Sequence, residues 1–133
     1  MIKPFIVCVA ITRSMPRKSH NPAVPVTIVE QVENPHAAFE AGAVIAHCHV
    51  PNDDESPQFR SRKVYASAGR LAAHCLGMIV QFSTRGRSGT ERDRGGMLGL
   101  RPDMVSLTVG SHTFPSHLYE NPPDLVDWLD SEI

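Results

Sequence analysis

The chain has 133 residues, of which 41% are hydrophobic and 20% charged, and its formal net charge is −1 with the histidines neutral. This size and composition suit one globular domain spanning residues 1–133 with a core of its own. The near-neutral charge excludes a general electrostatic attraction to nucleic acid, and no apolar stretch is long enough to cross a membrane. The first residues lack the cleavage pattern of a signal peptide, so we expect a cytoplasmic protein.

Four apolar segments predict β-strands, at residues 5–11, 43–49, 78–83 and 104–110. Their near-continuous apolar character is typical of strands that are covered on both faces, as in a parallel sheet. We therefore expect both faces of the sheet to be buried.

The segment 27–42 has the pattern of an amphipathic helix. Thr27 and Glu30 have the spacing of a capping box, and Gly42 is a typical helix stop. Pro35 lies inside this helix, where it removes a backbone donor and costs roughly 3 kcal/mol unless the helix kinks. We expect the inner face to carry Val29, Val32, His36 and Phe39.

Two more helices are predicted further along the chain. The segment 62–75 places Val64, Ala68, Leu71 and Cys75 on one face. The last helix is expected to begin with Asn121 as the N-cap before Pro122. Its apolar residues are Leu125, Trp128, Leu129 and Ile133.

The order of these elements is strand–helix–strand–helix–strand–loop–strand–helix. Such alternation predicts an α/β fold with a parallel sheet and right-handed crossovers. A complete TIM (β/α)₈ barrel needs about 200 residues or more. The four predicted strands therefore form either a small open sheet or half of a barrel.

The second predicted strand ends in two histidines one residue apart. Since successive side chains of a strand point to opposite faces, His47 and His49 point the same way, and Cys48 points away. Two imidazoles placed in this way can share a metal ion such as zinc, whose catalytic sites commonly use three protein ligands. The alternative is an ordinary histidine pair, and the nearby Asp53, Asp54 and Glu55 are best interpreted as a solvated loop.

Polar side chains also follow or end the other strands, at the sheet edge where parallel α/β proteins build their sites. Ser83 and Thr84 close the third strand, and Ser106 and Thr108 lie in the fourth. Their hydroxyls can bind a substrate, or they can satisfy loop backbone.

The polar loop 83–96 contains four arginines and no aromatic residue that could stack on a base. They can bind an anionic group, but a solvated loop is the better interpretation of Arg85, Arg87, Arg92 and Arg94.

The three cysteines form no CxxC pair, and we expect reduced thiols that are mostly buried. Cys8 and Cys75 are interpreted as core residues, because no neighbour in the sequence would activate their thiolates.

Four ordered blocks of the sequence resemble the β-keto acid cleavage enzymes, the family that includes the 3-keto-5-aminohexanoate cleavage enzyme. The blocks are "AITRSMPRKSHNPAVPVT", "FEAGAVIAHCHVPNDDESP", "GMIVQFSTRGRSG" and "LRPDMVSLTVGSHTFPSHLYENPPDLVDWL". The resemblance implies the N-terminal half of a TIM barrel that binds zinc or another divalent metal. It also implies that a β-keto acid and acetyl-CoA react to give acetoacetate and a new acyl-CoA.

The resemblance also assigns roles to individual residues. His47 and His49 match the family's two histidine ligands, Ser83 matches a serine that helps to hold the substrate, and Ser106 and Thr108 match further polar contacts. In the family, a glutamate ligand, a general-base aspartate and a substrate-binding arginine come from the second half of the barrel. Arg13 and Arg85 stand where the family usually has glycine, and Pro51 where it often has arginine.

Three hypotheses follow for this chain. It works with a complementary C-terminal half or as a homo-oligomer, it is an inactive remnant, or it is a non-catalytic metal-binding or interaction module. For the chain by itself we expect weak metal binding and no measurable cleavage. The acyl group of the substrate is not determined by the sequence.

Overall fold

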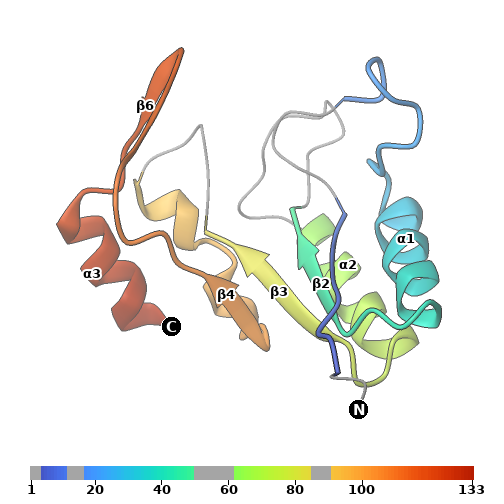
Figure 1. Cartoon of the computed structure of the whole chain (residues 1–133). Helices are drawn as coiled ribbons and strands as arrows, with labels where there is room; N and C mark the ends of the chain where they lie inside the picture. The colour runs from blue at the N-terminus through green and yellow to red at the C-terminus, as the bar shows by residue number, and fades with distance from the viewer. Residues whose placement is uncertain (1–3, 12–16, 50–61, 85–90) are drawn as a thin grey trace.

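The computed structural model describes residues 4–11, 17–49, 62–84 and 91–133, and the side chains of residues 62–65, 91 and 92 are not included in the description. Three α-helices, two 3₁₀ helices and six strands lie in these ranges (Figure 1). In chain order they are β1 (Cys8–Ala10), α1 (Ile28–Glu40), β2 (Ile45–Cys48), α2 (Arg62–His74), β3 (Ile79–Ser83), η1 (Glu91–Gly95), η2 (Leu98–Leu100), β4 (Met104–Ser106), β5 (His112–Phe114), β6 (His117–Tyr119) and α3 (Pro123–Glu132).

The four predicted strands form one parallel sheet in the order β1–β2–β3–β4, as the alternation of strands and helices predicts. Each strand is shorter than its apolar segment. The observed arrangement is consistent with part of a TIM barrel, and the described residues do not close a ring.

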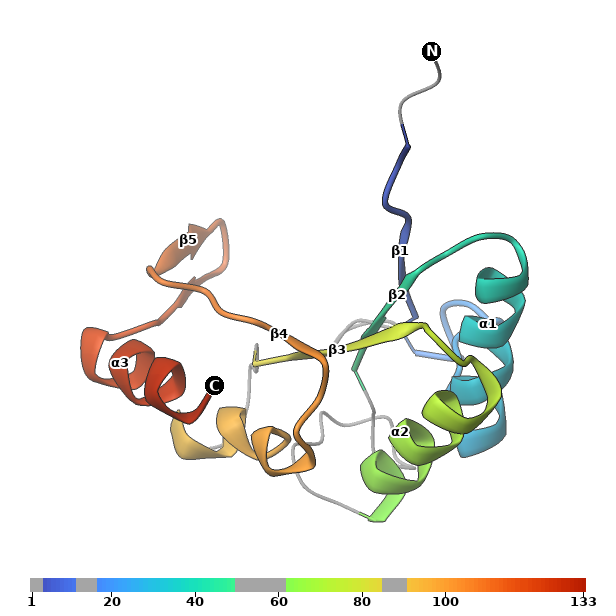
Figure 2. The same ribbon diagram turned by 90° about the horizontal axis from the view of Figure 1, so that it is seen from below.

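Among the described residues, helices cover only one face of the sheet, so the expectation that both faces are buried is not met in this part of the chain. The helices α1 and α2 lie together on one side of β1–β3, and α3 lies beyond β4 (Figure 2). On the helix side, Ala46 and Val80 are buried in the same row as Val9. On the other side, Ile79 and Met104 are 38% and 42% exposed. The apolar character of a strand indicates that its side chains are buried, but it does not indicate which element covers them. No described element lies over this second face.

Cys8 is exposed for the same reason, which corrects its prediction as a core residue. It lies in a row with Ile45 and Ile79 on the uncovered face of the sheet. Cys48 and Cys75 are buried as expected, and burial raises the pKa of the Cys48 thiol to about 12.

The main hydrophobic core lies between the sheet and its covering helices. Phe82 of β3, Leu71 of α2 and Cys75 just after α2 are buried in it, and Phe39 of α1 packs against it. Leu71, Cys75 and the neighbouring Ala68 confirm most of the predicted inner face of α2, while the side chain of Val64 lies outside the described residues. No helix in the described ranges combines the length and apolar character that a membrane span requires.

The capping box of α1 is present as predicted. The backbone N–H of Glu30 donates to Thr27 Oγ1 at 3.2 Å, and the backbone N–H of Thr27 donates to Glu30 Oε2 at 2.9 Å. The same carboxylate accepts from the backbone N–H of Val26 and pairs with Lys18 Nζ at 2.5 Å. At the other end, Gly42 has a φ of 99°, which a glycine adopts without steric cost as the chain turns into β2.

The predicted inner face of α1 is partly wrong. Gln31 and Pro35 are its buried residues, whereas Val29 is 53% exposed and His36 is exposed. Gln31 is stabilised there because its side-chain amide donates to the carbonyl oxygen of Pro25 at 2.6 Å. The helix continues through Pro35, whose ring takes an inner position that the apolar pattern assigned to other residues.

An antiparallel hairpin, β5–β6, follows β4 and projects from the rest of the fold (Figure 1). This hairpin was not predicted from the sequence.

The predicted cap of the last helix is wrong, since Pro122 rather than Asn121 is the N-cap of α3. Leu125 and Leu129 are buried as predicted, but Ile133 is 61% exposed.

The Glu30 contacts predict a stability that depends on pH. Lys18 and the N–H groups of Thr27 and Val26 lower the pKa of Glu30 from 4.5 to about 2. Because the folded-state pKa is the lower one, the stabilisation is present above about pH 4.5 and is lost as the pH falls towards 2. We expect Glu30→Gln to lower the unfolding free energy at pH 7, and we expect this effect to be smaller at pH 3 and to disappear only below about pH 2, measured by urea unfolding. Glu33→Gln, in the same helix but outside these contacts, is the control, and equal effects of both variants at pH 7 would contradict the prediction.

A second prediction concerns the contact between η1 and α3. A Cβ atom on Gly95 would lie 2.5 Å from Cη2 of Trp128 and 3.3 Å from Cδ2 of Leu129. We expect Gly95→Ala to destabilise the protein by about 1–3 kcal/mol, the usual cost of overpacking. Gly99→Ala is the matched control, because its Cβ would meet no atom within 4 Å. Thermal unfolding of both variants checks this, and an unchanged Gly95→Ala would show that Trp128 moves freely.

Candidate metal and substrate site

The register of the sheet brings the histidine pair into a row of side chains on the uncovered face. Ala10, His47, Gln81 and Met104 are consecutive Cα partners across β1, β2, β3 and β4. Paired residues of parallel strands point to the same face, so these side chains lie next to one another. Towards the carboxyl ends of the strands, Ser83 pairs with Ser106 and begins a second row on the same face. The sheet thus brings together polar residues that are far apart in the sequence.

His47 and His49 converge, as their spacing predicts. Their Nε2 atoms are 3.2 Å apart, and the two rings meet edge to face with centroids 5.0 Å apart. Two nitrogen ligands on a tetrahedral zinc, each about 2.05 Å from the ion, are about 3.3 Å apart. The measured separation therefore fits two imidazoles that share one ion. It equally permits a direct hydrogen bond in which one ring donates to the other.

Gln81 is a functional candidate that the sequence analysis missed. Its Oε1 lies 2.6 Å from Nδ1 of His47. A side-chain amide oxygen only accepts, so Nδ1 carries the hydrogen in this contact and Nε2 presents its lone pair to His49. The signal was present in the sequence. Gln81 is the polar residue between apolar neighbours in "MIVQFS", and it lies two residues before Ser83 on the same face.

The described part of the chain contains two candidate metal ligands, His47 and His49, and no cluster of three. No group of three or more His, Cys, Asp or Glu side chains suited to a metal occurs among these residues. Asp53, Asp54 and Glu55 lie outside the described residues, as do Arg13 and Pro51.

The predicted substrate-binding hydroxyls occupy different environments. Ser83 is buried, and Ser106 is half-buried opposite it. Thr84 is also buried, and its Oγ1 donates to the backbone carbonyl of Ser106 at 2.6 Å, which ties the end of β3 to β4. Thr108 is half-buried and lies two residues beyond the end of β4 rather than within the strand. The substrate roles of all four remain predictions.

Arg94 is buried, which corrects its interpretation as part of a solvated loop. Its guanidinium donates to the carbonyl oxygens of Thr84 and Glu120 and to Oδ1 of Asn121. It also lies 5.2 Å from the centroid of the Tyr119 ring. Arg94 therefore joins the end of β3 to the segment between β6 and α3. Arg85, Arg87 and the side chain of Arg92 lie outside the described residues.

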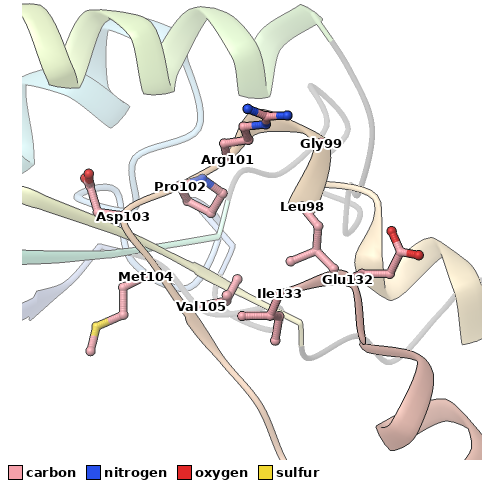
Figure 3. Close-up of a pocket in the computed structure, with 9 residues that line it drawn as sticks. All are labelled: Leu98, Gly99, Arg101, Pro102, Asp103, Met104, Val105, Glu132 and Ile133. Atoms are coloured by element: carbon pink, nitrogen blue, oxygen red, sulfur yellow. The ribbon is translucent and has the colours of Figure 1, made fainter. Parts of the chain in front are cut away.

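A hollow of about 640 Å³ lies elsewhere, at the start of β4 (Figure 3). Its lining includes Leu98, Asp103, Met104 and the C-terminal residues Glu132 and Ile133. It includes none of the histidines or hydroxyls of the predicted site. Asp103 has a structural contact here, since its Oδ2 accepts from the backbone N–H of Val80 at 3.0 Å. The chemistry-bearing residues and this hollow are thus separate features.

A sequence model of the β-keto acid cleavage enzyme family matches residues 4–133. The chain belongs to the β-keto acid cleavage enzyme family. This confirms the resemblance found in the sequence. The family is named for the cleavage of β-keto acids.

Three curated relatives of the family were compared with the chain. It is 56% identical over 133 residues to the 3-oxoadipate:acetyl-CoA acetyltransferase of Cupriavidus necator. It is 34% and 33% identical to the 3-keto-5-aminohexanoate cleavage enzymes of Fusobacterium nucleatum and Acetoanaerobium sticklandii, over 86% and 85% of its length. The aligned region covers 47%, 42% and 42% of these relatives, so the chain spans about half the length of the proteins it matches.

The convergent histidines predict a measurable effect on zinc binding. We expect His47→Ala and His49→Ala each to weaken zinc affinity by at least the roughly 10–100-fold that loss of an outer-shell partner costs. His36→Ala, on the exposed side of α1, is the control and is expected to leave the affinity unchanged. Competition with a chromophoric chelator measures all three. Equal zinc affinity of the His47, His49 and His36 variants would contradict a site at the histidine pair.

Proposed function

We propose that this chain supplies the first half of a zinc-dependent active site that transfers acyl groups between a β-keto acid and acetyl-CoA. The products are acetoacetate and the acyl-CoA of the incoming keto acid. In this exchange the C2–C3 bond of the keto acid breaks, and a new carbon–carbon bond forms between its C2 and the acetyl carbonyl. The released acyl group takes the CoA, so atoms and charge balance.

The observation that carries the proposal is the 3.2 Å separation of the two Nε2 atoms on the uncovered face of the sheet. His47 and His49 would hold the ion through these nitrogens. A divalent cation draws electrons from a ketone oxygen and so makes the neighbouring carbon more acidic. Zinc suits imidazole ligands, although other first-row metals also accept them.

The remaining residues of the site would bind and orient the substrate. Ser83 and Ser106 are Cα partners at the carboxyl ends of β3 and β4, so their hydroxyls can donate to the same anionic oxygen. Thr84 would act mainly through Ser106, because its hydroxyl holds the Ser106 carbonyl in place. Thr108, just beyond β4, would extend this polar row.

The second half of the site would come from a complementary C-terminal segment, on the same polypeptide or on another, or from a homo-oligomer. The family resemblance assigns a third metal ligand and the general base to that half. Among the described residues, no element covers the second face of the sheet, and β1 and β4 each pair on one side only. A complementary half would cover this face and pair with the free edges of β1 and β4, which supports the proposal.

For the substrate we propose 3-oxoadipate, a β-keto acid with a second carboxylate at its far end. The support is the 56% identity to the Cupriavidus necator relative, compared with 34% and 33% to the two 3-keto-5-aminohexanoate cleavage enzymes. By the exchange described above, 3-oxoadipate would yield succinyl-CoA together with acetoacetate.

Reconstitution tests the proposal. The chain is mixed with the separately produced C-terminal half of the Cupriavidus necator relative, zinc, acetyl-CoA and 3-oxoadipate. Acetoacetate is then measured with a coupled dehydrogenase. We expect no product from either polypeptide alone and steady formation from the mixture. His47→Ala should abolish it, whereas His36→Ala should leave it unchanged.

Two other outcomes would contradict the proposal and favour an alternative. Tight, stoichiometric zinc binding without product in the mixture would indicate a non-catalytic metal-binding module. Neither zinc binding nor product would indicate an inactive remnant. Replacing 3-oxoadipate by 3-keto-5-aminohexanoate tests the substrate separately. Faster turnover of 3-keto-5-aminohexanoate would overturn the proposed substrate but not the proposed reaction.

A further inference from the structure

Gln81 makes a contact that no predicted role accounts for. It lies opposite His47 on the neighbouring strand, and its Oε1 is 2.6 Å from Nδ1 of the imidazole. The position is set by the backbone, because His47 and Gln81 are Cα partners within the ladder that joins β2 to β3. The acceptor is thus part of a rigid element rather than of a loop.

The contact decides which nitrogen of His47 is available. A neutral imidazole carries one hydrogen, on either Nδ1 or Nε2. An acceptor at Nδ1 favours the form with hydrogen on Nδ1, which leaves a lone pair on Nε2. In the other form Nε2 would carry a hydrogen directed at His49, and it would be unable to bind a cation. Since Nε2 of His47 faces Nε2 of His49, the form that Gln81 selects is the one that a shared ion needs.

We propose that Gln81 is a positioning residue that fixes His47 with its hydrogen on Nδ1 and its Nε2 lone pair towards His49. The purpose of this role, metal binding, rests on the proposed function. The position of the hydrogen on His47, however, can be measured in the chain without metal. The ligand it serves is a divalent cation that prefers imidazole nitrogen. Gln81 itself touches neither the cation nor the substrate in this role.

The neighbouring side chains make the role specific to Gln81. Its other Cα partner, Met104, is 42% exposed and has only a weakly accepting thioether. Ala10, on the opposite side of His47, has no polar side-chain atom. Among the side chains of Ala10, Gln81 and Met104, which lie in the row with His47, only the glutamine amide can accept a hydrogen bond strongly.

The experiment uses the full 133-residue chain labelled with ¹⁵N at histidine. Long-range proton–nitrogen spectra at a pH where the rings are neutral distinguish hydrogen on Nδ1 from hydrogen on Nε2. We expect Nδ1–H for His47 in the wild type without metal. We expect Gln81→Leu to shift His47 to a mixture or to Nε2–H, and to weaken zinc binding about 10–100-fold, as outer-shell changes typically do.

Three further variants separate positioning from packing. Gln81→Glu retains an acceptor of the same length, so it should restore both the hydrogen position and the zinc affinity. Gln81→Asn keeps the amide but is one methylene shorter, so it should behave like Gln81→Leu even if the leucine variant does not fold. Met104→Leu alters the adjacent side chain without removing an acceptor from His47, and it should match the wild type.

The results distinguish this inference from the proposed function. Hydrogen on Nε2 of His47 in the wild type, or an unchanged spectrum in both Gln81→Leu and Gln81→Asn, would overturn the role of Gln81. A shift of the hydrogen in these variants, in a chain that binds no zinc, would support that role and contradict the metal-dependent function. An equal loss of zinc affinity in Gln81→Glu and Gln81→Leu would also overturn the role of Gln81, because a change in packing would then explain the effect.

Discussion

The parallel register of the sheet is the constraint on which the candidate site depends. It aligns Ala10, His47, Gln81 and Met104 in one row and places Ser83 next to Ser106. A shift of one residue in any strand would turn its side chains to the helix-covered face, where Ala46 and Val80 are buried. The cost of burying a histidine or glutamine without partners there fixes the register. The same packing that forms the core therefore assembles the polar row.

Arg94 provides the second organising contact, at the carboxyl ends of the strands. It is a buried cation whose hydrogen-bond acceptors are three neutral oxygens, from Thr84, Glu120 and Asn121. Burial of a charge is expensive, and several charge-assisted hydrogen bonds are needed to offset it. Asn121 also donates to the carbonyl oxygen of Gly110, so Arg94 is linked to the segment that follows β4. This network holds the end of β3 in place beside Ser106.

The helices show where local sequence signals are reliable and where they are not. The capping box of Thr27 and Glu30 was predictable because both partners lie within one helical turn. The inner face of α1 was not, because Gln31 is stabilised by the Pro25 carbonyl, which lies before the helix begins. Asn121 resembles an N-cap in sequence, but its side chain accepts a hydrogen bond from Arg94 and donates one to the carbonyl oxygen of Gly110. A residue with strong local preferences is thus redirected when a distant group offers a better hydrogen bond.

The four parallel strands, the capped helix α1 and the common direction of His47 and His49 could be predicted from the chain alone. They follow from apolar runs, residue spacing and the two-residue period of a strand, all of which are local properties. The family was indicated separately, by the resemblance of four ordered sequence blocks. Three features needed the folded arrangement: Arg94 is buried, Gln81 lies against His47, and no described helix covers the second face of the sheet. Those features depend on which strand lies beside which and at what register. Contacts between residues 34 positions apart, such as His47 and Gln81, leave no periodic pattern in the chain.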